Sequence, residues 1–348
     1  MSSSNIRVLV AEDSPTARAL LVAMLSASSG IEVIGEARDG LEAVELTLRL
    51  KPDVVTMDIQ MPQLDGYEAT RRIMTEHPTP IVIVSSLDVL AVEVSMEALR
   101  AGAVDVVPKP EGPSSPGHAQ AARYLAATVR AMAGIKLVRR WPAPQDVARP
   151  TPVGSRPLAV PPRVVALAAS TGGPAALHQV FSAIPADFPL PLLIVQHMAS
   201  GFTEGFAAWL DGSAKVKVKV ARAGEPLQPG VAYVAPDDRH LGVSKRGTVA
   251  LSDVPLVGGF RPSGTLLFQS VASSYGAASI AVILTGMGSD GLAGVRELKA
   301  AGGRVIAQDE ATSEIFGMPG VVVEARIADS VLPIGAIGGE ITRLCMPG

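Results

Sequence analysis

The sequence has few cysteine and aromatic residues. Its single cysteine, Cys345, cannot form an intramolecular disulfide, as expected for a protein of the reducing cytoplasm. Aromatic residues make up only 4% of the 348 residues, whereas hydrophobic residues make up 48%. The hydrophobic content excludes a largely disordered chain, so we expect a core built of aliphatic side chains.

Excess charge of either sign and long apolar runs are also absent. The formal net charge is −3 and no basic stripe occurs, which argues against nucleic-acid binding. The longest apolar runs, such as Ala277 to Leu284, are far too short to span a bilayer. Ile6 to Ala11 is too short for the core of a signal peptide. We therefore expect a cytoplasmic protein without direct membrane insertion.

The length suffices for about two domains, and the first is predicted over residues 5–132. Short β-branched apolar runs alternate there with segments of helical periodicity. Five such units predict an α/β domain with a five-stranded parallel sheet, wound with helices on both faces. The expected strands are Ile6–Ala11, Ile31–Ala37, Val54–Met57, Ile81–Val84 and Val104–Val107.

Polar side chains follow four of these strands. Glu12 and Asp13 follow the first strand, Asp58 the third, Ser85 the fourth and Lys109 the fifth. Three carboxylates at one sheet edge would repel each other unless a hard cation such as Mg²⁺ held them. A hydroxyl and an ammonium group nearby suit the oxygens of a phosphoryl group on Asp58. Taken singly, each residue also fits an ordinary helix cap or an exposed turn.

The first domain resembles the response-regulator receiver family, which has a flavodoxin-like fold. The resemblance implies that Asp58 accepts a phosphoryl group from a histidine kinase and that Glu12, Asp13 and Asp58 hold Mg²⁺. It also makes Ser85 the switch hydroxyl and Lys109 the phosphate-contacting cation. Glu12 stands where aspartate is common, which keeps the charge. The matching segments are Val10-Ala11-Glu12-Asp13-Ser14, Met57-Asp58-Ile59-Gln60-Met61-Pro62, Asp65-Gly66, Val84-Ser85-Ser86 and Pro108-Lys109-Pro110.

Residues 133–160 form a predicted linker. Prolines are spread through this stretch among alanine, arginine and glycine, with no apolar periodicity. This density of proline excludes helix and favours an extended, semi-rigid chain. The linker is either a passive tether or a hinge.

A second α/β domain is predicted over residues 161–348, with a doubly wound parallel sheet. The turn-rich stretch from Val216 to Ser252 is interpreted as short antiparallel hairpins inserted in the sheet. The expected strands are Val164–Ala169, Leu192–Gln196, Val216–Val220, Val231–Ala235, Ile280–Leu284 and Arg304–Ala307.

Ser170 ends the first strand of this domain. Gly172 and Gly173 follow it and lead into a helix-like segment. This order places the hydroxyl at the carboxyl edge of the sheet, near helix N–H groups able to receive an oxyanion. A helix cap or a phosphate-binding turn explains the same stretch equally well.

Two further residues extend the serine hypothesis. His197 follows a buried strand, and Asp290 lies in a glycine-rich turn before a helix. A serine nucleophile needs a base, and a carboxylate orients the imidazole that serves as one. His197 is also explained as a structural histidine, Asp290 as a helix cap, and His240 is a rival base. Spacing does not choose between them.

The second domain resembles the CheB-type methylesterase family, whose catalytic domain is Rossmann-like. The resemblance implies that Ser170 is the nucleophile, His197 the base and Asp290 its partner, with oxyanion donors near Thr171 and Met287. Such enzymes hydrolyse γ-glutamyl methyl esters on chemoreceptor helices, and many also deamidate glutamines. The matching segments are Ala169-Ser170-Thr171-Gly172-Gly173-Pro174, Val195-Gln196-His197-Met198, Phe202-Thr203, Ala235-Pro236-Asp237-Asp238-Arg239-His240, Leu284-Thr285-Gly286-Met287-Gly288-Ser289-Asp290-Gly291 and Phe316-Gly317-Met318-Pro319-Gly320.

Some positions depart from that family. Gly264-Thr265 stands where a bulkier apolar residue and an aspartate are usual, and Phe316 replaces a usual tryptophan. With the receiver-like domain in front, we expect a methylesterase whose esterase edge the unphosphorylated receiver obstructs. The alternatives are a serine hydrolase acting on another ester and a catalytically silent domain that docks on receptors.

Overall fold

The computed structural model describes residues 5–86, 89–115, 117–133 and 160–346. These residues form two compact units, one on each side of residues 134–159. All of the predicted linker except its two end residues lies outside the described part of the chain. Each unit is described by itself below.

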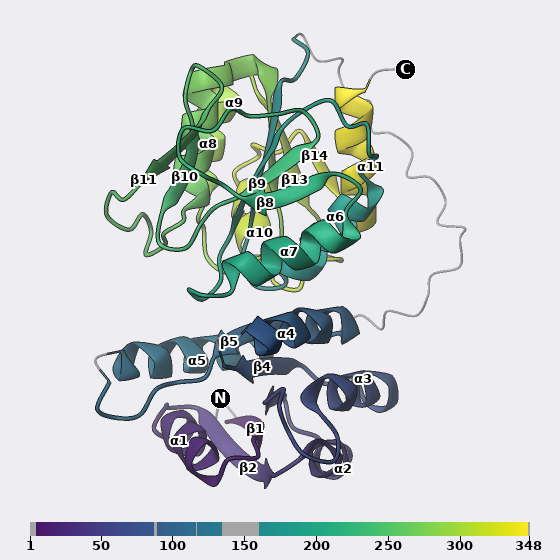
Figure 1. The fold of residues 1–348 in the computed structure, drawn as a ribbon, viewed down its shortest axis with the longest axis vertical. Coiled ribbons are helices and arrows are strands. Elements are labelled where there is room, and N and C mark those ends of the chain that lie inside the picture. Colours follow the sequence, from purple (N-terminus) through teal and green to yellow (C-terminus); the bar gives the residue numbers. More distant parts are fainter. Residues whose placement is uncertain (1–4, 87–88, 116, 134–159, 347–348) are drawn as a thin grey trace. The chain divides into compact units, whose positions relative to one another are not determined.

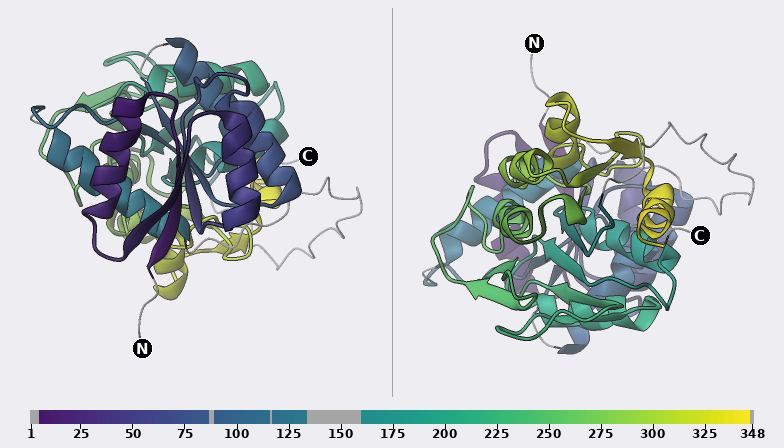
Figure 2. Two further views of the ribbon diagram at one scale, coloured as in Figure 1. Left: turned by 90° about the horizontal axis from the view of Figure 1, so that it is seen from below. Right: turned by 90° about the horizontal axis from the view of Figure 1, so that it is seen from above.

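The first unit is built on a five-stranded parallel sheet in the order β2-β1-β3-β4-β5. This order is that of flavodoxin-like folds, as predicted. Helices α1 and α5 pack together on one face, and α2, α3 and α4 cover the other (Figure 1; Figure 2, left). The elements are β1 (Ile6–Ala11), α1 (Pro15–Ser26), β2 (Ile31–Ala37), α2 (Gly40–Leu50), β3 (Val54–Met57), α3 (Gly66–Glu76), β4 (Ile81–Ser85), α4 (Val89–Ala101), β5 (Asp105–Pro108) and α5 (His118–Ala133).

Local sequence explains where the helices of this unit begin. Asp39 and Asp65 stand just before α2 and α3, and each carboxylate accepts a hydrogen bond from a backbone N–H in the first helical turn. Ser14 caps α1 in the same way. These caps satisfy N–H groups that have no partner within the helix. The caps at Ser14 and Asp65 hold the turns that follow β1 and β3, where the acidic residues lie.

The second unit contains a seven-stranded sheet in the order β14-β13-β12-β6-β7-β9-β8, with every pair parallel. Helices lie on both sides of it (Figure 2, right). This confirms the predicted doubly wound α/β architecture. The elements are β6 (Val164–Ala169), α6 (Gly173–Ala183), β7 (Leu192–Gln196), α7 (Thr203–Ser213), β8 (Lys217–Val220), β9 (Val231–Val234), β10 (His240–Val243), β11 (Val249–Ser252), α8 (Gly264–Tyr275), η1 (Gly276–Ala278), β12 (Ser279–Ile283), α9 (Leu292–Ala300), β13 (Arg304–Gln308), α10 (Met318–Glu324), β14 (Ser330–Leu332) and α11 (Ile334–Cys345).

The stretch from Val216 to Ser252 differs in part from its prediction. Strands β8 and β9 are parallel members of the main sheet, and only β10 and β11 form an antiparallel hairpin, in a separate two-stranded sheet. The chain between β8 and β9 contains turn residues, but it returns to the end of the sheet where β8 began, so that β9 runs parallel to β8. Its return is tied to the hairpin by Gly224 N–H donating to the Val249 carbonyl and Leu227 N–H donating to the Gly247 carbonyl. Turn composition marks where a strand ends but not the direction of the next one.

The core of the second unit is aliphatic, as the composition predicts. Strands β6, β7, β12 and β13 are buried along their whole length. Leu267 and Phe268 of α8 pack against one face of this sheet.

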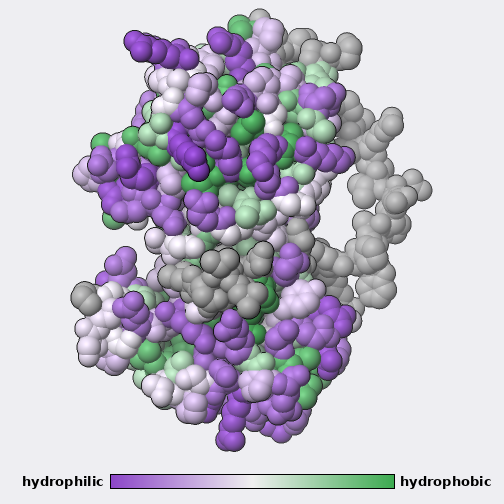
Figure 3. Space-filling model, in the orientation of Figure 1, coloured by the Kyte–Doolittle hydropathy of each residue, from purple (hydrophilic) through white to green (hydrophobic). Residues whose placement is uncertain are grey.

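The face of the molecule drawn in Figure 3 is covered mainly by hydrophilic residues, with small apolar areas between them. No helix among the described residues is both long and apolar enough to cross a bilayer.

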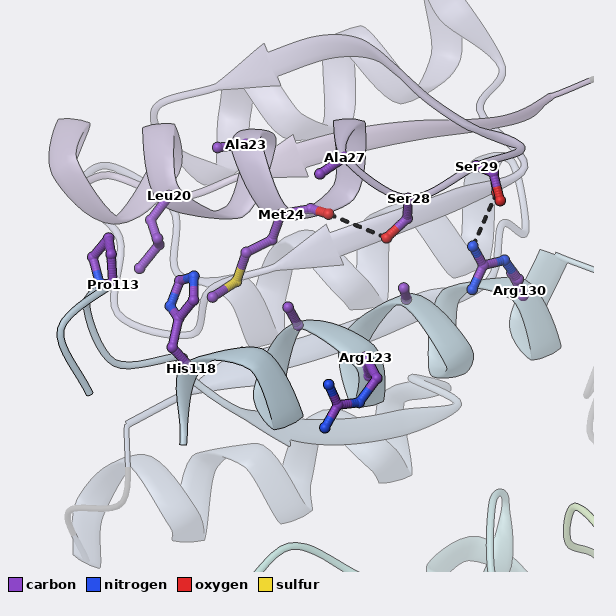
Figure 4. Close-up of a pocket in the computed structure, with 12 residues that line it drawn as sticks. Leu20, Ala23, Met24, Ala27, Ser28, Ser29, Pro113, His118, Arg123 and Arg130 are labelled. Atoms are coloured by element: carbon purple, nitrogen blue, oxygen red, sulfur yellow. Dashed lines mark hydrogen bonds between the residues drawn. The ribbon is translucent and has the colours of Figure 1, made fainter. Parts of the chain in front are cut away.

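A groove of about 670 Å³ lies between α1 and α5 of the first unit (Figure 4). Leu20 and Met24 of α1 form part of its floor, and His118 and Arg123 of α5 line the opposite side. Arg130 closes one end by donating a hydrogen bond of 2.9 Å to the Ser29 carbonyl. None of the residues that line this groove belongs to the acidic set of Glu12, Asp13 and Asp58.

Replacing Phe268 by alanine tests the core of the second unit. Phe268 is fully buried, so truncation is expected to lower the free energy of unfolding of this unit by about 3–5 kcal/mol. Leu256, which is 58% exposed, is the control, and its replacement by alanine is expected to change stability by less than about 0.5 kcal/mol. Urea unfolding followed by circular dichroism measures both. Equal effects of the two substitutions would contradict this account of the core.

Candidate functional site

The acidic residues of the first unit converge as predicted. Glu12 and Asp13 follow β1, Asp58 follows β3, and one carboxylate oxygen from each lies within 4.8 Å of the others. Lys109 follows β5, and its Nζ donates to Asp58 Oδ2 at 2.8 Å and to Glu12 Oε1 at 3.1 Å. The parallel sheet thus brings Glu12 and Asp13 together with Asp58 and Lys109, which are far from them in sequence.

Burial and mutual repulsion govern the charges of this cluster. Burial raises the pKa of Asp58, and the ammonium group of Lys109 only partly offsets this. Burial and then the charge of Asp58 raise the pKa of Glu12. Burial alone would lower the pKa of Lys109, but the hydrogen bond and charge of Asp58 raise it. A set of crowded carboxylate oxygens, destabilised as anions, is the donor set that suits a hard divalent cation such as Mg²⁺.

Ser85 lies at the same edge as this cluster. It is the last residue of β4 and is fully buried, and its carbonyl accepts a hydrogen bond of 2.8 Å from Lys109 N–H. Its Oγ has no hydrogen-bond partner among the described residues. The sheet therefore brings Ser85 next to Lys109, as the order of the polar residues predicts.

In the second unit, Ser170 stands at the carboxyl end of β6. Its N–H donates to the Thr285 carbonyl at 3.0 Å, and its own carbonyl accepts from Gly173 N–H at 2.8 Å. The turn then passes through Gly172 in the left-handed region (φ 74°) into α6. Gly286 packs so closely that a Cβ there would lie 2.6 Å from Ser170 Cβ. The Ser170 side chain thus lies between a helix N-terminus and the loop after β12.

His197 and Asp290 are paired at this edge. His197 follows β7, and its Nε2 lies 2.9 Å from Asp290 Oδ2. The carboxylate also accepts from Ser263 Oγ (2.7 Å) and from the N–H groups of Gly264 (2.6 Å) and Thr265 (3.1 Å). Burial alone would raise the pKa of Asp290, but the hydrogen bonds and charges of its partners hold it well below its usual value. Asp290 is therefore an anion, and His197 Nε2 carries the proton that faces it.

The backbone links His197 to Ser170. His197 N–H donates to the Ala169 carbonyl at 2.9 Å. The Gln196 side-chain amide donates to the Ser170 carbonyl at 2.7 Å and to the His197 carbonyl at 2.8 Å. His197 Nδ1 is buried and has no hydrogen-bond partner among the described residues. The serine, histidine and aspartate singled out in the sequence thus lie at one sheet edge, although no hydrogen bond joins Ser170 Oγ to the ring among those residues.

The other residues singled out take different places. His240 begins β10, and its Nε2 hydrogen-bonds to the Pro255 carbonyl at 3.3 Å rather than to Asp290. Thr171 follows Ser170 in the turn, and its carbonyl accepts from Thr285 Oγ1 at 3.0 Å. Met287 follows Gly286 in the loop that packs on Ser170. Both residues predicted to donate to an oxyanion therefore flank the serine.

The sequence did not point to Ser263 or Phe260 as site residues. Ser263 donates to Asp290, and the Phe260 ring stacks on the His197 ring. The only sequence signal is that both lie just before Gly264-Thr265, one of the positions where the sequence departs from the family. Gly264 has a clear reason to lack a side chain, because a Cβ there would lie 2.8 Å from Ala168 Cβ.

Comparison with known proteins decides the family. Residues 165–341 match the model of CheB methylesterases, and residues 8–115 match the response regulator receiver domain. The chain belongs to the CheB methylesterase family.

Full-length relatives support this assignment. The chain is 57% identical over 346 residues to protein-glutamate methylesterase/protein-glutamine glutaminase 4 of Myxococcus xanthus (strain DK1622), covering 98% of each chain. It is 55% identical over 338 residues to protein-glutamate methylesterase/protein-glutamine glutaminase 3 of Anaeromyxobacter dehalogenans (strain 2CP-C), covering 97% of this chain and 98% of the other. The crystal structure of the Thermotoga maritima CheB methylesterase catalytic domain covers 53% of this chain and all of its own, with 40% identity and a TM-score of 0.52. The protein is thus a receiver-linked enzyme of the methylesterase/glutaminase class.

The low pKa of Asp290 gives a testable pH dependence. The unfolded-state value is about 3.8 and the folded value lies below it. The ionised carboxyl therefore stabilises the fold at all pH values above 3.8, and this contribution is lost as pH falls through the folded value. In ¹³C NMR, the Asp290 carboxyl resonance, assigned by its absence in Asp290→Asn, should keep its ionised shift down to pH 3.8. A titration midpoint at or above 3.8 would contradict the hydrogen-bond network.

Proposed function

We propose that this chain hydrolyses glutamyl methyl esters on the cytoplasmic helices of chemoreceptors, with Ser170 as nucleophile, His197 as base and Asp290 as the partner of His197. The observation that carries the proposal is the His197–Asp290 pair at the sheet edge where Ser170 follows β6. A serine without a base is a weak nucleophile. The His197–Asp290 pair therefore favours a hydrolase over the alternative that the turn at Ser170 only binds phosphate.

We assign the roles of the two His197 ring nitrogens from the hydrogen bond to Asp290. Asp290 accepts the proton of Nε2, which leaves the lone pair on Nδ1. In the familiar serine-protease triad, by contrast, the aspartate faces Nδ1 and the serine faces Nε2. Here Nδ1 takes the Ser170 proton as Oγ bonds to the ester carbonyl carbon. The resulting imidazolium is stabilised by the anionic Asp290.

The remaining steps follow from the same groups. Collapse of the tetrahedral intermediate breaks the ester C–O bond, and Nδ1–H gives its proton to the departing methanol. A water molecule then attacks the acyl-enzyme, loses its proton to Nδ1 and releases the glutamate as Ser170 regains its proton. With a glutamine substrate the leaving group is ammonia in place of methanol. We assign the oxyanion to the backbone N–H groups of Thr171, just before α6, and Met287, in the loop after β12 that packs on Ser170.

The first unit supplies the control. We assign Asp58 as the acceptor of a phosphoryl group from a histidine kinase, with Ser85 and Lys109 as the groups that bind its oxygens. Glu12, Asp13 and Asp58 would hold Mg²⁺, which neutralises charge on the acceptor and phosphoryl oxygens when bound. The unphosphorylated receiver obstructs the esterase edge, and phosphorylation relieves this. Two sites on separate units, joined by a proline-rich stretch, support this regulation.

Replacing Ser170 by alanine is expected to lower kcat/KM for methanol release from methylated receptor by about 10⁴-fold or more. Ser182→Ala is the control, because Ser182 is an exposed serine on α6 whose hydroxyl donates to the His178 carbonyl. A fluorophosphonate should label the wild type and Ser182→Ala but not Ser170→Ala.

Other results would favour the alternatives. Intact demethylation by Ser170→Ala would exclude this serine as the nucleophile. Faster turnover of generic esters than of methylated receptor would indicate a hydrolase with another substrate. Absence of both labelling and turnover in the wild type would indicate a silent docking domain.

Substitution of Asp58 tests the regulation. A small-molecule phosphodonor with Mg²⁺ should raise methylesterase activity several-fold in the wild type and leave Asp58→Asn unchanged, because the acceptor carboxylate is gone. Glu45→Gln removes an exposed carboxylate outside the cluster and should respond like the wild type. Deletion of residues 1–140 should raise basal activity. A deletion variant with unchanged activity would exclude inhibition by occlusion.

A further inference from the structure

Phe260 lies face to face with the imidazole of His197. The two ring centroids are 4.0 Å apart and the ring planes differ by only 4°. Phe260 belongs to the chain between β11 and α8, far in sequence from His197. We propose that Phe260 is a positioning residue, which holds the His197 ring in the orientation that serves Ser170. This inference rests on the proposed role of His197 as the base.

A second constraint on the ring is needed. The hydrogen bond to Asp290 fixes one point on the ring edge, Nε2, but leaves the ring free to rotate about the line through that bond. Such a rotation would move Nδ1, which has no hydrogen-bond partner among the described residues to hold it. A parallel contact on the ring face blocks this motion because the flat surfaces must stay in contact. The edge contact and the face contact together determine where Nδ1 points.

Phe260 is itself held in place. The backbone N–H groups of Val257 and Phe260 each donate to the other residue's carbonyl at 3.1 Å. The adjacent Arg261 bonds through Nε to Asp238 Oδ1 at 2.7 Å and through Nη1 to the Asp253 carbonyl at 3.1 Å. The aromatic ring is therefore presented by a closed, anchored loop rather than by a free side chain.

The same short segment also contacts the aspartate. Ser263 Oγ and the N–H groups of Gly264 and Thr265 donate to the Asp290 carboxylate. Residues 260–265 thus touch the face of His197 and the carboxylate that binds its edge. One piece of backbone sets the relative placement of both members of the pair, and pre-organisation of this kind favours the reaction.

The stack also suits the charge that His197 acquires. When Nδ1 accepts the Ser170 proton, the ring becomes an imidazolium lying over the electron-rich face of Phe260. An aliphatic side chain of similar size fills the space but offers neither a flat surface nor a quadrupole. Comparing Phe260→Leu with Phe260→Tyr therefore separates the effect of the aromatic ring from the effect of side-chain volume.

The test measures kcat and KM for methylated receptor together with ¹⁵N NMR of labelled histidine. Phe260→Leu should lower kcat about tenfold with little change in KM, and Phe260→Tyr should keep most of the activity. The control is Leu256→Ala, on the same loop but exposed and outside the stack. In the wild type, His197 should show one tautomer with its proton on Nε2. Phe260→Leu should give broadened or mixed resonances, and Phe260→Tyr and Leu256→Ala should not.

The outcomes separate the positioning role from others. Unchanged kcat in Phe260→Leu, or an equal loss in the leucine and tyrosine variants, would overturn the proposal. A rise in KM alone would place Phe260 in contact with substrate and also overturn it. A fall in kcat in Phe260→Leu, with histidine resonances like those of the wild type, would also overturn the proposal. The NMR measurement does not depend on turnover. An active Ser170→Ala variant would refute the proposed function, but the histidine resonances of the Phe260 variants would still test whether Phe260 holds the His197 ring.

Discussion

The hydrogen bond between His197 Nε2 and Asp290 Oδ2, 2.9 Å long, is the interaction on which the proposed esterase site depends. Asp290 is a buried anion that also accepts hydrogen bonds from Ser263, Gly264 and Thr265. A buried carboxylate without such donors would take up a proton and lose its ability to orient the imidazole. The same bond indicates which nitrogen of His197 carries a proton and, in the proposed mechanism, which nitrogen is left for Ser170.

Both units use the same constraint to assemble their chemistry. In a parallel sheet every strand ends at the same edge, so residues distant in sequence meet there without a long loop to hold them. Lys109 reaches Asp58 across the first sheet at 2.8 Å, and His197 follows the strand that neighbours β6, where Ser170 stands. The close approach of Gly286 to Ser170 shows how little room this edge leaves. Tight strand-end loops carry the functional groups, and the sheet behind them supplies the rigidity.

Sequence patterns predicted much of this arrangement. Alternating apolar runs located the strands of the first unit to within one residue, and the position of polar residues just after them predicted both clusters. The patterns were less informative where the chain is irregular. The stretch from Val216 to Ser252 was expected to contain only hairpins, yet β8 and β9 are parallel. The short elements α10 and β14 were not expected at all, because each is too short for its periodicity to be recognised.

The sequence by itself determined which residue types stand at the strand ends, since strand pattern, glycine turns and polar residues are local features. It left His197 and His240 as rival bases, because spacing along the chain carries no information about which side chain reaches Asp290. The tertiary structure decided this contact by placing His197 against Asp290 and tying His240 to the Pro255 carbonyl. It also brought in Phe260 and Ser263 from another segment. Contacts of this kind depend on packing between distant elements, which no local pattern encodes.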